Sequence, residues 1–262
     1  MIKSFLTLVA QFIQKVLTPV YRCKGRPIPQ FEILDRHDLE YFFLENEVKD
    51  IYEKGFYFAS MQGTDSLFKR NRLNNLYYWV LAACSKAKSA NVVELGCWRG
   101  HSSYIILRAM RSSESSGQLF IFDSFEGGLS EKTDKDYYAD IRPSQQAVLT
   151  EAKLFASTEE GVHKVLQDFG NFRTFRGWIP ERFQEVASHK FCLVHIDVDL
   201  YEPITESLEF FYARLVSGGV IVIDDYGYTQ FPGARRAVDT FLIDHAVSAF
   251  VPNAIGGCVI IK

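Results

Sequence analysis

Two pairs of aspartates stand at the ends of two apolar runs in the second half of the chain. Asp197 and Asp199 follow the run "FCLVHI", and Asp224 and Asp225 end the run "GGVIVIDD". A single strand-end aspartate usually caps a helix or faces water, but two matching pairs repel one another unless a cation lies among them. Carboxylate oxygens select hard cations, so the pattern predicts a Mg²⁺ site. Such an ion lowers the pKa of a coordinated hydroxyl group, which can then attack.

A glycine-containing loop, "VVELGCWRGHSS", follows another β-rich run. Gly96 allows a sharp turn after the strand, and Gly100 allows close approach to a ligand or to the next helix, which Ser102 and Ser103 can cap. A βα turn that needs both glycines for its geometry alone is the alternative. The spacing E-x-G-x-x-x-G differs from the G-x-G-x-x-G that binds a pyrophosphate. Glu94 disfavours an anion and favours an ammonium group, such as the methionine end of S-adenosylmethionine.

The next loop, "FIFDSFEGG", places Asp123 at the end of its strand. A carboxylate at this point typically binds the ribose hydroxyls of a nucleoside cofactor. Alone, Asp123 could equally cap a helix or lie in a solvated turn, but the glycine loop one βα unit earlier favours the cofactor. The residues predicted to contact S-adenosylmethionine are Glu94, Gly96, Trp98, Gly100, Ser102, Asp123, Ser124 and Phe125.

The histidines and cysteines give weaker indications of function than the aspartates and the glycine loop. His101 directly follows Gly100 and is the histidine best placed for ligand contact, whereas His195 is expected to be a buried, satisfied strand residue. The chain contains no C-x-x-C, H-E-x-x-H or nucleophile-elbow pattern, which argues against zinc chemistry and nucleophilic hydrolysis. Its five cysteines are widely spaced and odd in number, which predicts small buried thiols in a reduced cytoplasmic protein.

These loops need strands and helices that bring them together. From Asn91 onward, short β-rich runs alternate with helical stretches, which predicts βαβ units and a mostly parallel sheet covered on both faces. The β-rich runs lie at 91–95, 118–123, 172–175, 190–197, 218–225, 248–252 and 258–262. The last two should be antiparallel, because the short turn "NAIGG" leaves no room for a helix. Ligands bind beyond the carboxyl ends of the strands in such a sheet, where all these loops fall.

The part before Asn91 is expected to be helical. Stretches 36–55 and 65–89 have helical patterns, and residues 1–17 carry apolar side chains at helical spacing that polar residues interrupt. This first stretch is too polar to span a membrane and lacks a secretory cleavage site. It predicts a docking or dimerisation helix, with a surface-lying membrane helix as the alternative. We expect an N-terminal helical extension over 1–60 and a catalytic domain over 61–262.

Composition narrows the range of partners. Of the 262 residues, 47% are hydrophobic, and the net charge is −3 without any basic block. This composition argues against nucleic acid, and we expect a homo-oligomer that accepts a small molecule or a glycoside. The long polar stretch from Gly127 to Pro143 predicts a lid that orders when ligands bind. A plain surface insertion is the alternative for this stretch.

Four segments carry a family resemblance: "VELGCWRGHSS", "FDSFEGG", "HIDVDLYEPITESLEFFYARLVSGGVIVIDDYG" and "PGARRAVDTF". Together they resemble the macrocin-type O-methyltransferases, S-adenosylmethionine-dependent enzymes that act on sugar hydroxyls. The resemblance runs from about Gly63 to the C-terminus, and the linked D-x-D-L-Y-E and D-D-Y-G block is its specific part. It implies a Rossmann-like class I methyltransferase fold of seven strands, with the last strand antiparallel. The segment "GTDSLFKRNRLNNL" departs from the more compact stretch usual in the family.

The resemblance also implies roles for the aspartates. Asp197, Asp224 and Asp225 would hold Mg²⁺, and Asp199 would be the general base, unless Asp197 both binds the metal and accepts the proton. The expected activity is metal-dependent methyl transfer to a hydroxyl group, on a sugar of a glycoside or polysaccharide precursor. The alternatives are catechol-like phenol methylation and a non-catalytic nucleoside-binding protein of the same fold. The glycine spacing disfavours an NAD-dependent oxidoreductase.

Overall fold

A computed structural model describes residues 22–23, 26–27, 45–61, 64–126, 128–138, 153–253 and 256–262. The chain divides into two units, Met1–Leu39 and Glu40–Lys262. In the first unit, the described residues form a short antiparallel pair, β1 (Arg22–Cys23) and β2 (Arg26–Pro27). The helix expected over residues 1–17 lies outside the described residues.

The boundary between the units falls earlier than the expected position after residue 60. The reason is helix α2 (Asn46–Phe58), which buries Val48, Ile51 and Tyr52 within the core of the second unit. An apolar stripe at this spacing needs a partner surface, and α2 finds one on α4. The segment from Glu40 onward therefore belongs to the same unit as the sheet.

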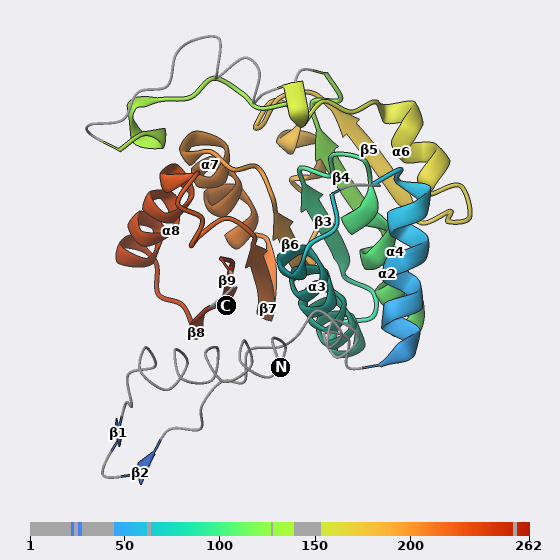
Figure 1. Cartoon of the computed structure of the whole chain (residues 1–262), viewed down its shortest axis with the longest axis horizontal. Helices are drawn as coiled ribbons and strands as arrows, with labels where there is room; N and C mark the ends of the chain where they lie inside the picture. The colour runs from blue at the N-terminus through green and yellow to red at the C-terminus, as the bar shows by residue number, and fades with distance from the viewer. Residues whose placement is uncertain are drawn as a thin grey trace, which may run out of the picture. The chain divides into compact units, whose positions relative to one another are not determined.

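The second unit is built on a seven-stranded sheet in the order β5-β4-β3-β6-β7-β9-β8 (Figure 1). Its strands are β3 (Asn91–Leu95), β4 (Leu119–Asp123), β5 (Phe172–Arg176), β6 (Phe191–Ile196), β7 (Leu215–Ile223), β8 (Ala249–Pro252) and β9 (Cys258–Ile261). Neighbours from β5 to β7 pair in parallel, and β9 runs antiparallel to both β7 and β8. The predicted mostly parallel sheet with an antiparallel last strand is confirmed.

Helices cover both faces of this sheet (Figure 1). One face packs against α2, α3, α4 and α6, and the other packs against α7 and α8. The helices after α2 are α3 (Leu67–Lys86), α4 (His101–Ser112), α6 (Glu159–Val165), α7 (Tyr201–Tyr212) and α8 (Pro232–Asp244). Successive residues of a strand point to opposite faces, so Val92 joins the first core and Val93 the second. Because both faces are covered, β6 is buried along its whole length, which explains its continuous apolar run.

The register of the central strands brings their carboxyl ends together. Ile196 of β6 lies opposite Ile223 of β7, so the residues that follow, Asp197 and Asp224, are neighbours. The Asp224 amide donates to the Ile196 carbonyl at 3.0 Å, and the Asp197 amide donates to the Leu95 carbonyl of β3 at 2.9 Å. The chain order reverses at β3, which lies between β4 and β6. Ligand crevices form at such reversal points, and the predicted loops meet here.

Two expectations concern the rest of the described chain. Within those residues, no helix has the length and apolar character needed to cross a membrane. Four of the cysteines, Cys84, Cys97, Cys192 and Cys258, are buried and free, in agreement with the prediction of small buried thiols. They fill space in the core as small apolar side chains.

Candidate active site

A pocket with an empty volume of about 590 Å³ lies where the carboxyl ends of the central strands meet. Its lining comprises Gly96, Trp98, Asp123, Ser124, Gly128, Leu129, Ser130, Phe155, Gly177, Trp178, Ile179, Asp197, Val198, Asp199 and Pro203. One pocket therefore joins the glycine loop, the loop after β4 and the first pair of aspartates.

The glycine loop turns sharply after β3, as predicted. Gly96 has a φ of +80°, and a Cβ atom at this position would lie 2.0 Å from the carbonyl oxygen of Asp197. Only glycine fits there, because the loop packs directly on the backbone that carries the first aspartate pair. Gly100 has a φ of +82° and precedes α4. The first glycine thus fixes the distance between the predicted cofactor loop and the aspartate rim.

Asp123 ends β4 and organises the glycine loop. Its Oδ2 accepts hydrogen bonds from the amides of Cys97 at 2.9 Å and Trp98 at 3.1 Å, and its Oδ1 accepts one from Phe125 at 2.9 Å. Burial raises the pKa of the Asp123 carboxyl, and these three amides oppose that effect. A carboxylate oxygen has two acceptor sites, so Asp123 retains capacity toward the pocket that it lines.

Three non-glycine residues in the loops at this edge have left-handed backbone conformations. They are Trp98 (φ +46°), Phe125 (φ +52°) and Asp199 (φ +60°), and they follow β3, β4 and β6 respectively. Such conformations cost about 1–3 kcal/mol each and persist where the surroundings enforce them. They are frequent at ligand sites, and here Trp98 and Asp199 both line the pocket.

Glu94 does not line the pocket, contrary to the expectation that it contacts the ammonium group of a cofactor. Its side chain is fully buried, because alternate residues of β3 face the helix layer below the pocket. Its Oε2 accepts a hydrogen bond from Ser103, and its Oε1 lies 3.1 Å from His195 Nδ1. The sequence could not show this pairing, since His195 is on a different strand.

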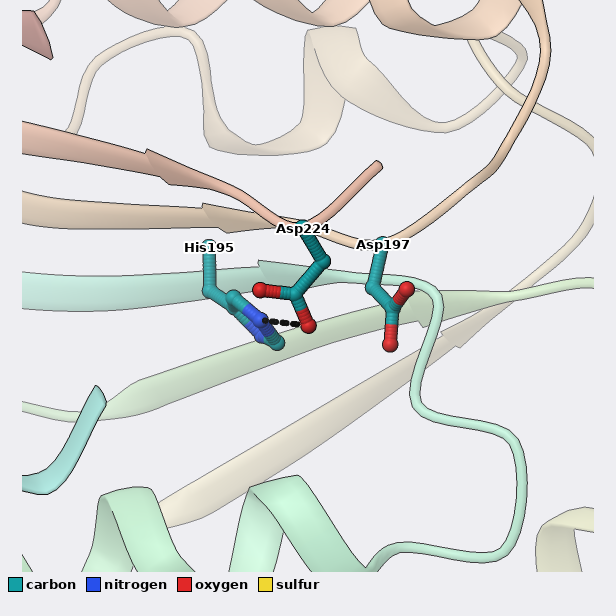
Figure 2. Close-up of side chains that lie close together, drawn as sticks. All are labelled: His195, Asp197 and Asp224. Atoms are coloured by element: carbon teal, nitrogen blue, oxygen red, sulfur yellow. Dashed lines mark ion pairs between the residues drawn. The ribbon is translucent and has the colours of Figure 1, made fainter. Parts of the chain in front are cut away.

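A chain of alternating charges extends from Glu94 to the rim. His195 Nε2 lies 3.2 Å from Asp224 Oδ2 (Figure 2). Asp224 Oδ2 also lies 3.0 Å from Arg72 Nε, and Arg72 Nη2 lies 3.6 Å from Asp197 Oδ2. The order is therefore carboxylate, imidazole, carboxylate, guanidinium, carboxylate. Buried charges are stable only when they are paired in this way.

The pKa values follow from these neighbours. Burial alone would lower the pKa of His195, but the charges of Asp224 and Glu94 outweigh burial and raise this pKa to about 10. Burial tends to raise the pKa of Asp224, but Arg72 and His195 hold it below its usual value. His195 is therefore a cation at neutral pH. The prediction that His195 is a buried strand residue agrees with this placement, but its Nε2 makes no directed hydrogen bond among the described residues.

The residues at the rim fit a hard cation in part. Ligand atoms of His195, Asp197 and Asp224 lie within 4.8 Å of one another (Figure 2). Asp225 Oδ2 is buried without a hydrogen-bond partner among the described residues. Burial, followed by the nearby charges of Asp199 and Asp197, raises the pKa of Asp225 well above its usual value. An added cation would remove this excess of negative charge, so the donor set suits the predicted metal.

Arg72 is a rim residue that the sequence pattern did not predict. It lies on α3, which contacts β6 and β7, and it is more than a hundred positions before the aspartates in sequence. The only sequence signal is the segment "FKRNRLNNL", in which charged residues begin a long helix. Nothing in that segment indicates which of its basic residues faces the sheet. Arg72 thus supplies part of the positive charge that balances the aspartates.

Two expectations about the start of α4 are wrong. Gly100 caps this helix without a side-chain hydrogen bond, so neither Ser102 nor Ser103 is the cap, and Ser103 binds Glu94 instead. His101 does not face a ligand, because α2 covers it and its Nε2 donates to the Tyr52 carbonyl at 3.0 Å. The covering helix could not be anticipated from the local pattern around Gly100.

The described part of the predicted lid begins at the pocket and is then held by contacts with α7 and α8. Gly128, Leu129 and Ser130 line the pocket. Farther along, Asp136 is buried, and its Oδ1 accepts a hydrogen bond of 2.7 Å from the amide of Tyr201 at the start of α7. Arg236 of α8 donates to the Tyr137 carbonyl at 2.9 Å. Movement over the site stays a prediction.

Comparison with protein families gives one match over most of the chain. Residues 60–260 match the family described as Macrocin-O-methyltransferase (TylF). This range includes α3, the seven-stranded sheet except for Ile261 at the end of β9, and every residue of the pocket. The resemblance expected from about Gly63 onward is confirmed.

Curated relatives are similar over part of their length. The 8-demethyl-8-(2,3-dimethoxy-alpha-L-rhamnosyl)-tetracenomycin-C 4'-O-methyltransferase of Streptomyces olivaceus is 28% identical over 166 residues, 59% of this chain and 60% of that protein. The mycinamicin III 3''-O-methyltransferase of Micromonospora griseorubida is 26% identical over 68% of this chain and 70% of its own length. The chain thus spans less than two thirds of the first relative.

Solved structures share the fold. The O-methyltransferase NovP is 24% identical, with a TM-score of 0.58 over 73% of this chain and 79% of that one. The calicheamicin methyltransferase CalS11 is 16% identical, with a TM-score of 0.53 over 88% of this chain and 98% of that one. At these sequence identities, the likeness shows that the chain shares the fold of these proteins, that is, the arrangement of the sheet and helices.

Proposed function

The chain belongs to the macrocin-O-methyltransferase family, and we propose that it transfers a methyl group from S-adenosylmethionine to a sugar hydroxyl of a glycoside or polysaccharide precursor. One observation carries the proposal. A single pocket is lined both by the glycine loop with Asp123 and by Asp197 with Asp199. A methyl donor and an acceptor hydroxyl must meet in such a pocket for direct transfer.

The cofactor half of the pocket consists of the loops after β3, β4 and β5. Asp123 would accept hydrogen bonds from the ribose hydroxyls, because a carboxylate at the end of this strand has that role in related nucleotide folds. The aromatic rings of Trp98, Phe155 and Trp178 also line the pocket and offer flat apolar surfaces to a purine base. S-adenosylmethionine supplies the activated methyl group, so the protein mainly has to orient it.

The acceptor half consists of the aspartates after β6. Asp199 is buried, lines the pocket and would accept the proton of the attacking hydroxyl. The new oxygen–carbon bond forms as the carbon–sulfur bond breaks, and S-adenosylhomocysteine leaves with the electron pair. Asp197 lines the same wall and is the alternative base. A carboxylate acts well as a base when it is within hydrogen-bond reach of the hydroxyl.

We further propose that a divalent cation, most suitably Mg²⁺, binds at the rim. Asp197 and Asp224 would hold it, and Asp225 would join them with its otherwise unpartnered oxygen. Hard oxygen ligands of this kind favour Mg²⁺. A cation there would lower the pKa of the acceptor hydroxyl.

The sugar acceptor is supported by two relatives. One is named as a 4'-O-methyltransferase of a rhamnosyl tetracenomycin, and another as a 3''-O-methyltransferase of mycinamicin III. A catechol-like phenol is the other acceptor class, and the described residues offer no feature that favours it.

The first test is calorimetry of the purified chain with S-adenosylmethionine and with NAD. Binding of S-adenosylmethionine alone supports the proposal, and binding of NAD alone would refute it.

A further inference from the structure

Arg72 bridges the carboxyl ends of two neighbouring strands. Its Nε lies 3.0 Å from Asp224 Oδ2 after β7, and its Nη2 lies 3.6 Å from Asp197 Oδ2 after β6. The Asp224 side chain is 2% exposed, whereas the Arg72 side chain is 27% exposed. The guanidinium thus reaches the rim from α3, with its Nε buried and about a quarter of the side chain exposed.

These contacts pair opposite charges, but they leave buried hydrogen-bonding atoms without a partner. Arg72 Nε and Asp224 Oδ2 are within ion-pair distance, yet both are buried and neither makes a well-directed hydrogen bond among the described residues. A guanidinium that matched its carboxylate would form the parallel two-point pairing typical of arginine. The pair of Arg72 and Asp224 therefore lacks directed hydrogen bonds. Another ligand of Asp224 could supply them.

Arginine cannot relieve a competition by losing its proton. The side chain stays charged at every relevant pH. A second cation at the same carboxylates can be accommodated only if the guanidinium moves away, because like charges this close repel strongly. The partial exposure of the side chain gives it a direction in which to move.

We propose that Arg72 is a built-in counter-cation that competes with a divalent cation for Asp197 and Asp224. It holds the rim together when no metal is bound, and it withdraws from these carboxylates when a metal binds. The inference rests on the proposed divalent-cation site and adds that this chain sets its metal affinity through α3. Arg72 is in this sense a positioning residue, since it acts on the reaction only through the two aspartates.

The chain offers a matched control on the same helix. Arg70 lies two positions away, and its Nη2 pairs with Asp65 at 2.6 Å. Arg70→Gln removes the same unit of charge as Arg72→Gln and leaves the rim contacts in place. Arg72→Lys is a second variant, because it keeps a charge but lacks the planar, delocalised head of arginine.

The test is a Mg²⁺ titration of each chain after treatment with a chelator and its removal, followed by calorimetry. Without Arg72 the metal no longer displaces an internal cation, so Arg72→Gln should bind Mg²⁺ about tenfold more tightly than the unchanged chain, or more. Arg72→Lys should fall between the two, and Arg70→Gln should match the unchanged chain. Equal or weaker binding by Arg72→Gln would overturn the competition and leave the metal site standing.

Thermal unfolding separates competition from a merely structural role. In chelator, Arg72→Gln should unfold at a lower temperature than the unchanged chain, and saturating Mg²⁺ should close most of that gap. A gap of the same size with and without Mg²⁺ would overturn the inference. If no chain binds Mg²⁺, both the competition and the metal site fail. Binding of S-adenosylmethionine to the same samples then shows whether the rest of the proposed function stands.

Discussion

Individual side chains at the rim depend on partners of opposite charge. Asp224 lies between His195 and Arg72, and its pKa stays low because both are cations. Asp225 Oδ2 has no hydrogen-bond partner in the described chain, and burial, followed by the charges of Asp199 and Asp197, raises the pKa of Asp225. Removal of one member from a buried ion pair typically costs about 3–5 kcal/mol, because the remaining charge is left unpaired. The same residues that serve the proposed reaction are therefore also sensitive points for folding.

The first prediction separates the metal ligands from the base. Asp225→Asn should weaken Mg²⁺ binding, because an anionic oxygen is lost from a hard-cation site. Raising Mg²⁺ should then restore part of the methyl transfer. Asp199→Asn should keep its affinity for Mg²⁺ and S-adenosylmethionine, while turnover falls by about 100-fold or more. Calorimetry and single-turnover rates on both variants check this. Loss of Mg²⁺ by Asp199→Asn to the same degree as by Asp225→Asn would contradict the assignment.

The second prediction concerns Asp123. Asp123→Asn removes the charge that would strengthen hydrogen bonds to the ribose, so affinity for S-adenosylmethionine and S-adenosylhomocysteine should fall alike, by about 1.5–3 kcal/mol. Calorimetry measures both ligands, and the exposed Asp168→Asn is a control for charge. The melting temperature must also be recorded, because Asp123 accepts hydrogen bonds from the amides of Cys97 and Trp98 and its loss can lower stability. Unchanged affinity in a folded variant would exclude Asp123 from the cofactor site.

At the scale of the elements, the sequence predicts the strands better than the contacts between them. Strands such as β3 and β6 appear where apolar β-rich runs predict them, because parallel strands buried on both faces need such runs. The meeting of the aspartate pairs also followed from strand order alone. Pairings between distant elements did not, and these include Arg72 with Asp224 and Glu94 with His195. Which face of α3 packs on the sheet is decided by tertiary packing, which local patterns do not contain.

The third prediction tests how the glycine loop is attached to β6. Gly96→Ala places a methyl group against the Asp197 carbonyl and holds alanine at a positive φ. It should lower the free energy of unfolding by about 3 kcal/mol or more, and weaken S-adenosylmethionine binding. Gly170→Ala is the matched control, since its Cβ would meet nothing within 4 Å, and it should change stability by less than about 1 kcal/mol. Denaturant titrations of both variants check this, and equal stabilities would show that the loop is not packed as described.

The fourth prediction concerns the contact between α2 and α4. Burial lowers the pKa of His101 to about 4, compared with about 6.5 for an unfolded histidine. Between these values only the unfolded state binds the proton, so stability is fully present above pH 6.5 and is lost as the pH falls toward 4. The loss should reach about 3 kcal/mol. Denaturant titrations from pH 7 to pH 4 should show a shallower loss in His101→Gln, while the exposed His163→Gln should follow the unchanged chain. A parallel loss in all three would exclude His101 as a source of acid sensitivity.

At the scale of the whole molecule, both hydrophobic cores and the pocket lie in the unit Glu40–Lys262. The family match covers residues 60–260 of it. This unit therefore contains every described residue to which the proposed chemistry assigns a role. The helix expected over residues 1–17 lies outside the described residues and outside the family match, so its role in docking or dimerisation stays a prediction.

The central claim is that the whole chain moves a methyl group onto a sugar hydroxyl. The most direct test incubates the purified chain with S-adenosylmethionine that carries an isotope-labelled methyl group, Mg²⁺ and a panel of glycosides and catechols. Mass spectrometry with fragmentation then locates the label. We predict labelled methyl on a sugar hydroxyl of at least one glycoside, formed with S-adenosylhomocysteine and lost in Asp199→Asn. Label on a catechol alone, or on no acceptor although the chain binds S-adenosylmethionine, would contradict the account.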